Sequence, residues 1–272
     1  MNEVCDMTNL GYQDENRIAF LYRSTDGDKN VQSFNNCSDA YSVIFVTSGS
    51  GKCIVEGREF SLTAGSVIIA KPLEYYYVEI TDSTRFAYYT LSFASENLTD
   101  ANRDMLECAI GESRCLVFSD EAYKALLSAF ERSQITARLF DIHAEAYYRT
   151  LLSEIICLFS IARISAELTD EGELGFRVIK YIGEYLTRDL TLDFLSKRFL
   201  VSKYYLCRAF KKHNGISVHG YIVQKRVLWA KRLIESGVGA TIAAKRVGFC
   251  DYSAFYRAFV RIIGRPPFLT RT

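Results

Sequence analysis

The sequence predicts an α+β protein of two domains, with short strands in its N-terminal part and helices alone in its C-terminal part. Short β-branched and aromatic runs, separated by glycine turns, fill residues 41–93. From Ser119 onward, apolar residues recur at three- and four-residue spacing, which is typical of helices. The charge divides in the same way. Residues 174–272 carry 19 Lys and Arg against 5 Asp and Glu, whereas residues 1–173 carry 14 against 27.

The N-terminal strands are predicted from the runs that lie between turn signals. Turns are expected at residues 48–51, at Glu56-Gly57 and at residues 63–65, because glycine permits backbone angles that other residues avoid. The predicted strands are residues 41–47, 52–56, 58–62, 66–70 and 86–93. This order of strands and turns, closed by Pro72, resembles a cupin barrel. We expect the barrel to occupy residues 1–118 and to bind an effector.

The histidine content argues against a metalloenzyme in this barrel. The chain contains only His143, His213 and His219, so residues 1–142 contain no histidine. A first-row metal requires imidazole, thiolate or several converging carboxylate ligands. Because the barrel lacks histidine, we expect no metal, no cofactor and no catalytic residue. Tyrosine offers an apolar face and a hydroxyl group, which makes certain tyrosines candidates for ligand contact. These are Tyr75, Tyr77 and Tyr88, and the alternative is that they are core and rim residues.

The segment from residue 119 to residue 168 is predicted to be helical. One helix begins after Ser119 and runs to about residue 134, and a longer apolar-striped helix covers residues 141–168. The stripe can pack against the barrel, form a helix–helix dimer contact, or do both. The acidic residues 169–173 are expected to link this segment to the C-terminal domain, residues 174–272.

The C-terminal domain contains a repeat with an offset of 49 residues. The stretch from Ser202 to Gly215 is echoed by the stretch from Asp251 to Gly264. Each copy begins with a helix-capping residue, contains Arg-Ala-Phe and ends at a glycine. A supporting helix precedes each copy, and a long helix over residues 218–235 joins them. The pattern predicts two helix-turn-helix units held at a fixed separation.

In each repeat, apolar residues four positions apart should face inward. These are Leu206 and Phe210 in the first unit, and Phe255 and Phe259 in the second. The opposite sides then present basic and aromatic groups, which suits the major groove of DNA. Arg208 and Arg257 are the candidates for reading bases, followed by Lys203, Tyr204, Cys207, Tyr252, Ser253 and Tyr256; Lys211, Lys212, Lys225 and Arg261 are expected to contact phosphate.

The spacing of these residues resembles that of AraC/XylS-type transcriptional regulators. The second unit carries Ile242-Ala243, Val247-Gly248-Phe249, Phe255, Arg257, Phe259, Gly264 and Pro267, and the first carries Leu195, Ser202, Leu206, Arg208, Phe210-Lys211 and Gly215. Four positions depart from the family pattern, and one of them is Thr270, which stands in place of a usual aromatic residue. Ser196 replaces alanine in the first supporting helix, Leu200 stands where the turn often has glycine, and Val260 replaces a basic residue.

The resemblance implies a sequence-specific transcription regulator, an activator, that binds double-stranded DNA, forms a homodimer, contacts RNA polymerase and senses a small molecule. A cytoplasmic, nucleoid-associated bacterial protein is expected. The eight scattered cysteines form no Cys-x-x-Cys motif, and neither a signal peptide nor a membrane span is visible. Two alternatives remain: a cupin-type enzyme fused to a DNA anchor, and a regulator controlled by a protein partner without a small ligand.

Overall fold

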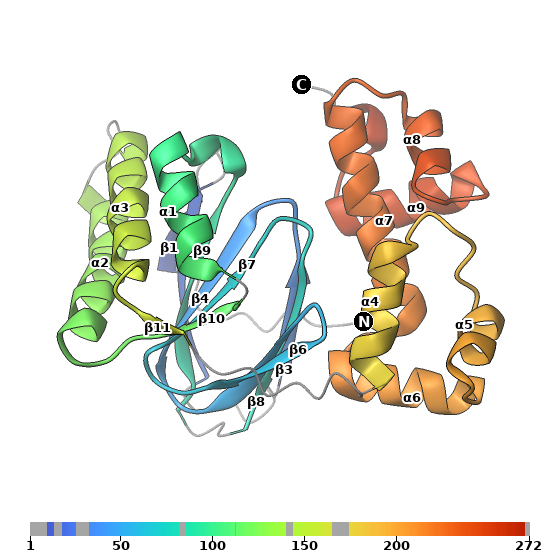
Figure 1. Ribbon diagram of the computed structural model, residues 1–272. Helices are drawn as coiled ribbons and strands as arrows, with labels where there is room; N and C mark the ends of the chain where they lie inside the picture. The colour runs from blue at the N-terminus through green and yellow to red at the C-terminus, as the bar shows by residue number, and fades with distance from the viewer. Residues whose placement is uncertain are drawn as a thin grey trace.

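The computed structural model describes residues 10–13, 18–25, 33–81, 85–111, 113–139, 144–164 and 174–269. It contains an N-terminal domain built on antiparallel sheets and a C-terminal domain of helices (Figure 1). The two-domain α+β prediction is therefore confirmed. Within the described ranges, no helix combines the length and apolar character that a membrane span requires.

Two antiparallel sheets face each other in the N-terminal domain. Counted over the described residues, one sheet has seven strands in the order β1-β2-β9-β4-β7-β10-β11 and the other has four in the order β3-β8-β5-β6. The strands are β1 (Leu10–Gln13), β2 (Ile18–Ser24), β3 (Ser33–Cys37), β4 (Tyr41–Ser48), β5 (Gly51–Val55), β6 (Arg58–Leu62), β7 (Ser66–Ala70), β8 (Tyr75–Ile80), β9 (Ala87–Phe93), β10 (Cys115–Val117) and β11 (Arg163–Ile164).

Apolar side chains fill the space between the two sheets. Strands β4 and β7 of the larger sheet contribute Ile44 and Ile68, and strands β5 and β8 of the smaller sheet contribute Cys53 and Val78. Successive side chains of a strand point to opposite faces of the sheet. Those on the other face of the larger sheet are apolar as well, and helices cover them. This second core includes Phe45, whose ring packs on the ring of Phe130.

The helical layer comprises α1 (Asp100–Ile110), α2 (Asp120–Leu139) and α3 (Ala144–Phe159). Helix α3 is shorter than the predicted helix over residues 141–168. The chain turns after Phe159, and Arg163–Ile164 instead pairs with β10 as a short edge strand. Residues 141–143 and 165–173, which include the expected linker, lie outside the described residues.

The C-terminal domain is formed by α4 (Leu174–Glu184), α5 (Leu192–Phe199), α6 (Lys203–Asn214), α7 (Val218–Glu235), α8 (Ala240–Arg246) and α9 (Tyr252–Ile263). A 3-10 turn at Pro267–Leu269 follows them, and another at Ser95–Asn97 precedes α1. Helix α7 has the predicted bounds. The helix has 18 residues and is therefore about 27 Å long. This length holds apart the two units that the helix connects.

The first helix-turn-helix unit packs against the outer face of the four-stranded sheet. Tyr75 of β8 and Cys37 of β3 belong to the same apolar cluster as Phe210 and Tyr221. The Tyr75 ring meets the Tyr221 ring edge-to-face at 5.6 Å. The two domains thus share a continuous core, and the four-stranded sheet is covered on both faces.

Candidate nucleic-acid interface

Helix α6 is positioned by side-chain and backbone caps at its two ends. Ser202 Oγ accepts a hydrogen bond from the backbone N–H of Tyr205 at 3.2 Å, which satisfies one of the first-turn donors. Gly215 ends the helix with a left-handed φ of 70°. Leu206 and Phe210 are fully buried, as predicted. These contacts orient the opposite side of α6 toward solvent.

Helix α9 repeats this construction in the second unit. The Asp251 carboxylate accepts hydrogen bonds from the backbone N–H groups of Ser253 and Ala254 at 3.1 and 2.8 Å. These two bonds lower the pKa of Asp251 below its ordinary value, because they favour the charged form. Gly264 ends the helix at φ 80°. Phe255 is fully buried, as predicted, so the repeat seen in the sequence is a repeat of capped helices.

The residues proposed for DNA contact lie on the open sides of α6 and α9. Cys207 is half-buried, and Lys203 forms an ion pair with Asp193 of the supporting helix α5. Tyr204 is 75% exposed. The exposed members of the set are Lys203, Tyr204, Arg208, Lys211, Lys212, Tyr252, Ser253, Tyr256, Arg257 and Arg261. Each unit therefore presents basic and aromatic groups to solvent.

The turn of the first unit forms without glycine. Leu200 closes α5 in the left-handed conformation, with φ 56° and ψ 41°, and its N–H lies against the carbonyls of Ser196 and Lys197. Its side chain is 91% exposed. The departure from the family pattern at this position thus leaves the turn intact, although the backbone conformation is one that L-residues avoid. Ser196 is buried, and its hydroxyl donates to the Asp193 carbonyl at 3.0 Å.

Arg226 of α7 ties the two units together. Its guanidinium donates to the carbonyls of Leu186 and Arg188, after α4, and to the carbonyl of Gly248, in the turn of the second unit, at 3.0, 2.6 and 2.8 Å. Burial lowers the pKa of Arg226. A cleft of about 640 Å³ beside it separates the units and is lined in part by Arg257 and Arg261. No local sequence pattern indicates this tie, because a Lys-Arg pair on a helix usually faces solvent.

Lys225 faces the barrel, which contradicts the prediction that it contacts phosphate. Its ammonium group donates to Glu56 at 2.9 Å and to the carbonyl of Leu73. Six residues further along α7, Lys231 forms an ion pair with Asp39. The basic side chains of this helix are thus divided between the barrel and the units. The sequence could not reveal this division, because the partners lie more than 150 residues away.

The tyrosines proposed for ligand contact do not form one group. Tyr75 is fully buried, and its hydroxyl donates to the backbone carbonyl of Asn214 at 2.8 Å. The ring of Tyr77 lies against Gly215. Tyr88 is buried between the two sheets, where it stacks on Phe34 at 4.8 Å. Two of the three tyrosines therefore contact the first helix-turn-helix unit.

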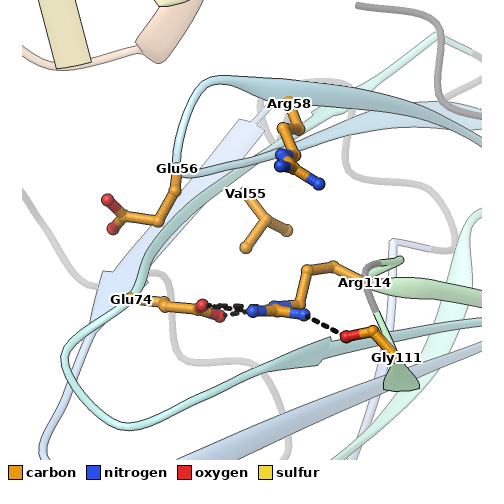
Figure 2. Close-up of a pocket in the computed structure, with 6 residues that line it drawn as sticks. All are labelled: Val55, Glu56, Arg58, Glu74, Gly111 and Arg114. Carbon is orange, nitrogen blue, oxygen red and sulfur yellow. Dashed lines mark hydrogen bonds and ion pairs between the residues drawn. The ribbon is translucent and has the colours of Figure 1, made fainter. Parts of the chain in front are cut away.

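A cavity lies at the end of the barrel that faces this unit. It measures about 420 Å³ and is lined by Val55, Glu56, Arg58, Glu74, Gly111 and Arg114 (Figure 2). Arg114 forms a two-pronged pair with Glu74 at 2.8–3.1 Å. Burial by itself lowers the pKa of Arg114, but the hydrogen bonds and charge of Glu74 offset this effect and raise it overall. Across the described residues, no cluster of three or more His, Cys, Asp or Glu could hold a metal.

Models of known protein families match both the N-terminal and the C-terminal part of the chain. Residues 21–152 match the model of the AraC-like ligand binding domain, and residues 195–272 match a helix-turn-helix domain model. An uncharacterized HTH-type transcriptional regulator, YbfI of Bacillus subtilis, is 24% identical over 82% of each chain. The Msm operon regulatory protein of Streptococcus mutans is 23% identical and covers 90% of this chain and 89% of its own.

Among solved structures, the C-terminal domain of AraT, a response regulator from Geobacillus stearothermophilus, is 28% identical. It covers 38% of this chain and 87% of its own, with a TM-score of 0.36. The two domain models together span the barrel and both helix-turn-helix units, and the relatives that match along most of the chain are transcriptional regulators. The chain belongs to the AraC family of transcriptional regulators.

Proposed function

We propose that this regulator is a non-enzymatic, sequence-specific activator that reads DNA with both helix-turn-helix units, dimerises, and responds to a small molecule bound by its N-terminal domain. In this scheme residues 1–118 sense the effector, residues 119–168 dimerise, and residues 174–272 bind DNA. The protein acts in the bacterial cytoplasm on the nucleoid and engages RNA polymerase.

One observation carries the proposal for DNA reading. Arg208 and Arg257 occupy equivalent positions in the two repeats, and both are exposed beside exposed tyrosines. A guanidinium can bridge O6 and N7 of guanine in the major groove, which makes this pair suited to reading bases. Lysines at the C-terminal end of α6, Lys211 and Lys212, are exposed and suit phosphate contacts.

The dimerisation proposal concerns the outer surface of the helical layer. The apolar stripe of α3, including Tyr148 and Ile155, is buried against the larger sheet, so that stripe packs within the domain. A dimer contact would therefore use the remaining faces, where Ile135 of α2 is 58% exposed.

The reading residues are tested by measuring binding of the full chain to the upstream region of its own gene. Changing Arg208 or Arg257 to Ala should cost about 1–3 kcal/mol, a loss of affinity of about 5- to 150-fold, if each residue reads a base. The affinity of the wild-type protein should fall steeply with salt, because bound phosphates release counterions.

Arg103→Ala is the matched control, since Arg103 is an exposed arginine on α1 in the other domain and the change in net charge is the same. We expect it to bind DNA like the wild type. Equal affinities for all four proteins, or no dependence on salt, would refute the proposal.

A further inference from the structure

Helices α4 and α5 of the first helix-turn-helix unit form an exposed surface of aromatic rings and basic side chains. The ring of Tyr181 on α4 contacts the rings of Phe194 and Phe199 on α5, at centroid distances of 6.2 and 5.8 Å. This α4–α5 surface consists of Arg177, Lys180, Tyr181, Phe194, Arg198 and Phe199. Phe194 is 42% exposed, so the surface presents apolar as well as charged groups to solvent.

Both arginines of the α4–α5 surface lie over aromatic rings. The Arg198 guanidinium is 5.5 Å from the centre of the Tyr181 ring, and the Arg177 guanidinium is 5.6 Å from the centre of the Phe199 ring. Each pair joins the two helices, because Arg198 and Phe199 belong to α5 and the other two residues belong to α4. Attraction to a ring face restricts an arginine without using its N–H donors. The restriction lowers the entropy that the side chain loses when it binds a partner.

Among the described residues, no carboxylate pairs with the basic side chains of the α4–α5 surface. Arg177, Lys180 and Arg198 form neither an ion pair nor a side-chain hydrogen bond with any part of the chain that the structure describes. These three cations line a cavity of about 230 Å³ together with Tyr181, Glu184 and Phe199. Glu184 is the single carboxylate of this lining. The cavity therefore has a net positive charge, and its cations are available to an acidic group.

The α4–α5 surface is turned away from the open face of the reading helix. Asp193 of α5 pairs with Lys203 on the open side of α6. Arg198 follows Asp193 by five residues, which places it about 140° further around the helix. Phe194, one turn before Arg198, faces Tyr181 of α4. A duplex bound to α6 would therefore leave the α4–α5 surface accessible.

The docked barrel also leaves this surface open, because it contacts the opposite side of α4. Phe176, Ile179 and Ile182 are buried on that side. Phe176 and Ile179 lie against Gly57, in the turn between β5 and β6. Arg177 and Lys180 are exposed although both domains are in contact. The contacts within the described chain thus account for the inner side of α4 and leave its outer side without a partner.

We propose that the α4–α5 surface binds an acidic segment of a partner protein, with one carboxylate side chain held between Arg177, Lys180 and Arg198. The planar fork of a guanidinium matches the two oxygens of a carboxylate. A volume of about 230 Å³ lies below the usual range for small-molecule sites, so the cavity suits a side chain better than a whole metabolite. The inference goes beyond the proposed function, because this surface serves neither DNA reading nor effector binding.

The exposed apolar groups favour a protein over the phosphate backbone of DNA as the partner. Phe194 is 42% exposed, and Leu200, which directly follows Phe199, is 91% exposed. Arginine and aromatic side chains together are typical of the energetic centre of protein interfaces, where surrounding contacts exclude water. A phosphate backbone would use the cations alone and would leave the apolar groups in water. We therefore expect the bound segment to combine acidic and apolar side chains.

Binding is tested by fluorescence anisotropy of the full chain at fixed ionic strength, with a short labelled peptide of glutamate, leucine and glycine. The control peptide carries glutamine in place of every glutamate. We expect saturable binding of the acidic peptide and binding of the control that is weaker by about tenfold or more. Arg177→Gln and Arg198→Gln should each weaken binding of the acidic peptide about tenfold. Arg198→Lys, which keeps the charge but not the fork, should bind more tightly than Arg198→Gln. Arg246→Gln, which changes an exposed arginine of α8, should bind like the wild type.

A second titration, in the presence of saturating DNA from the upstream region of the gene, separates the α4–α5 surface from the reading helices. DNA covers Arg208 and Arg257 in the proposed function, so a peptide on the α4–α5 surface should stay bound. Displacement of the peptide by DNA would overturn the proposal and identify a nucleic-acid contact instead.

Two further outcomes overturn the proposal: equal affinities for the acidic and the control peptide, or equal affinities of Arg177→Gln, Arg198→Gln and Arg246→Gln for the acidic peptide. DNA affinity without peptide is measured in parallel. If peptide binding fails while Arg208-dependent DNA binding persists, the proposed regulator stands and only this inference falls. If DNA binding fails while Arg198-dependent peptide binding persists, the reverse holds.

Discussion

Single residues carry unusual backbone conformations where the regulator needs a sharp turn. Leu200 is the clearest case, since it adopts left-handed angles although its side chain is almost fully exposed and contributes little burial. For an L-residue this conformation costs about 1–2 kcal/mol. The turn forms because the supporting helix and the reading helix on either side of it are fixed by their own buried residues, Leu195 and Leu206.

Replacing Leu200 with glycine should therefore stabilise the protein. Removing the left-handed strain gains about 1–2 kcal/mol, and the greater chain entropy of unfolded glycine returns about 0.5–1 kcal/mol. We expect a net gain of up to about 1.5 kcal/mol in the free energy of unfolding, measured in urea. Leu269→Gly is the control, because Leu269 is also exposed but lies outside the left-handed region. A loss of stability in both variants would contradict the explanation.

Among the elements, α7 sets the geometry of the whole C-terminal domain. One side of it holds the core of both units, with Tyr221 in the first cluster and Val227 in the second. Arg226 adds hydrogen bonds to loops at both ends of the domain. The helix thereby acts as a rigid spacer between α6 and α9, which a protein that enters two neighbouring segments of the major groove requires.

Changing Arg226 to Met should loosen this spacing. The variant leaves three backbone carbonyls without their donor, which should lower the free energy of unfolding by about 1–3 kcal/mol. DNA affinity should fall as well, because the spacing of the two reading helices is no longer held by these hydrogen bonds. Arg246→Met, at an exposed arginine of α8, should change stability little. Normal DNA binding by a stably folded Arg226→Met protein would show that the tie is not needed for reading.

On the scale of the whole molecule, an acidic domain is docked on a basic one. Residues 1–173 contain 27 Asp and Glu, and the C-terminal domain contains 19 Lys and Arg. Among the described residues, the ion pairs Glu56–Lys225 and Asp39–Lys231 cross the boundary. Cys37 lies beneath it, where burial raises the pKa of its thiol to about 12. The docking therefore neutralises part of the positive charge of the C-terminal domain.

The repeat supplies a matched pair of variants that tests this docking. Gly215 and Gly264 end equivalent helices with left-handed angles. A Cβ at Gly215 would lie 2.4 Å from the ring of Tyr77, whereas a Cβ at Gly264 meets nothing within 4 Å. Both alanine variants should lose about 1 kcal/mol through the strained cap. Gly215→Ala alone should also separate the domains, seen as a larger radius of gyration in small-angle X-ray scattering. Equal radii for both variants would contradict the docked arrangement.

The sequence predicted those parts of the fold that depend on local spacing. The caps Ser202 and Asp251, the inward Phe255 and the bounds of α7 all follow from neighbours within a few residues. Strand β8 escaped prediction because Tyr75, Tyr76 and Tyr77 offer no alternation between polar and apolar residues. Tyr75 and Tyr77 were ligand candidates, yet both face the first helix-turn-helix unit, whereas Tyr76 between them lies between the two sheets.

The contact between the two domains could not be predicted from the sequence, for a different reason. Glu56 and Lys225 are 169 residues apart, and a glutamate in a turn or a lysine on a helix is ordinarily a solvent-exposed charge. Nothing in their local sequence distinguishes them from their neighbours. The cavity beside Glu56 was missed with them, because Arg58 and Arg114 are brought together only by the pairing of β7 with β10 and of β5 with β6.

The two helix-turn-helix units differ in where their apolar cores come from. The cluster of the second unit draws its buried residues from positions 223–259 alone. The cluster of the first includes Cys37 and Tyr75 of the barrel. Local opening is favoured where buried contacts are few. Detached from the barrel, the first unit would therefore exchange its amide hydrogens faster than the second, although both reading helices carry the same Arg-Ala-Phe motif and the same glycine cap. The N-terminal domain is, in this sense, a folding partner of one reading helix and not of the other.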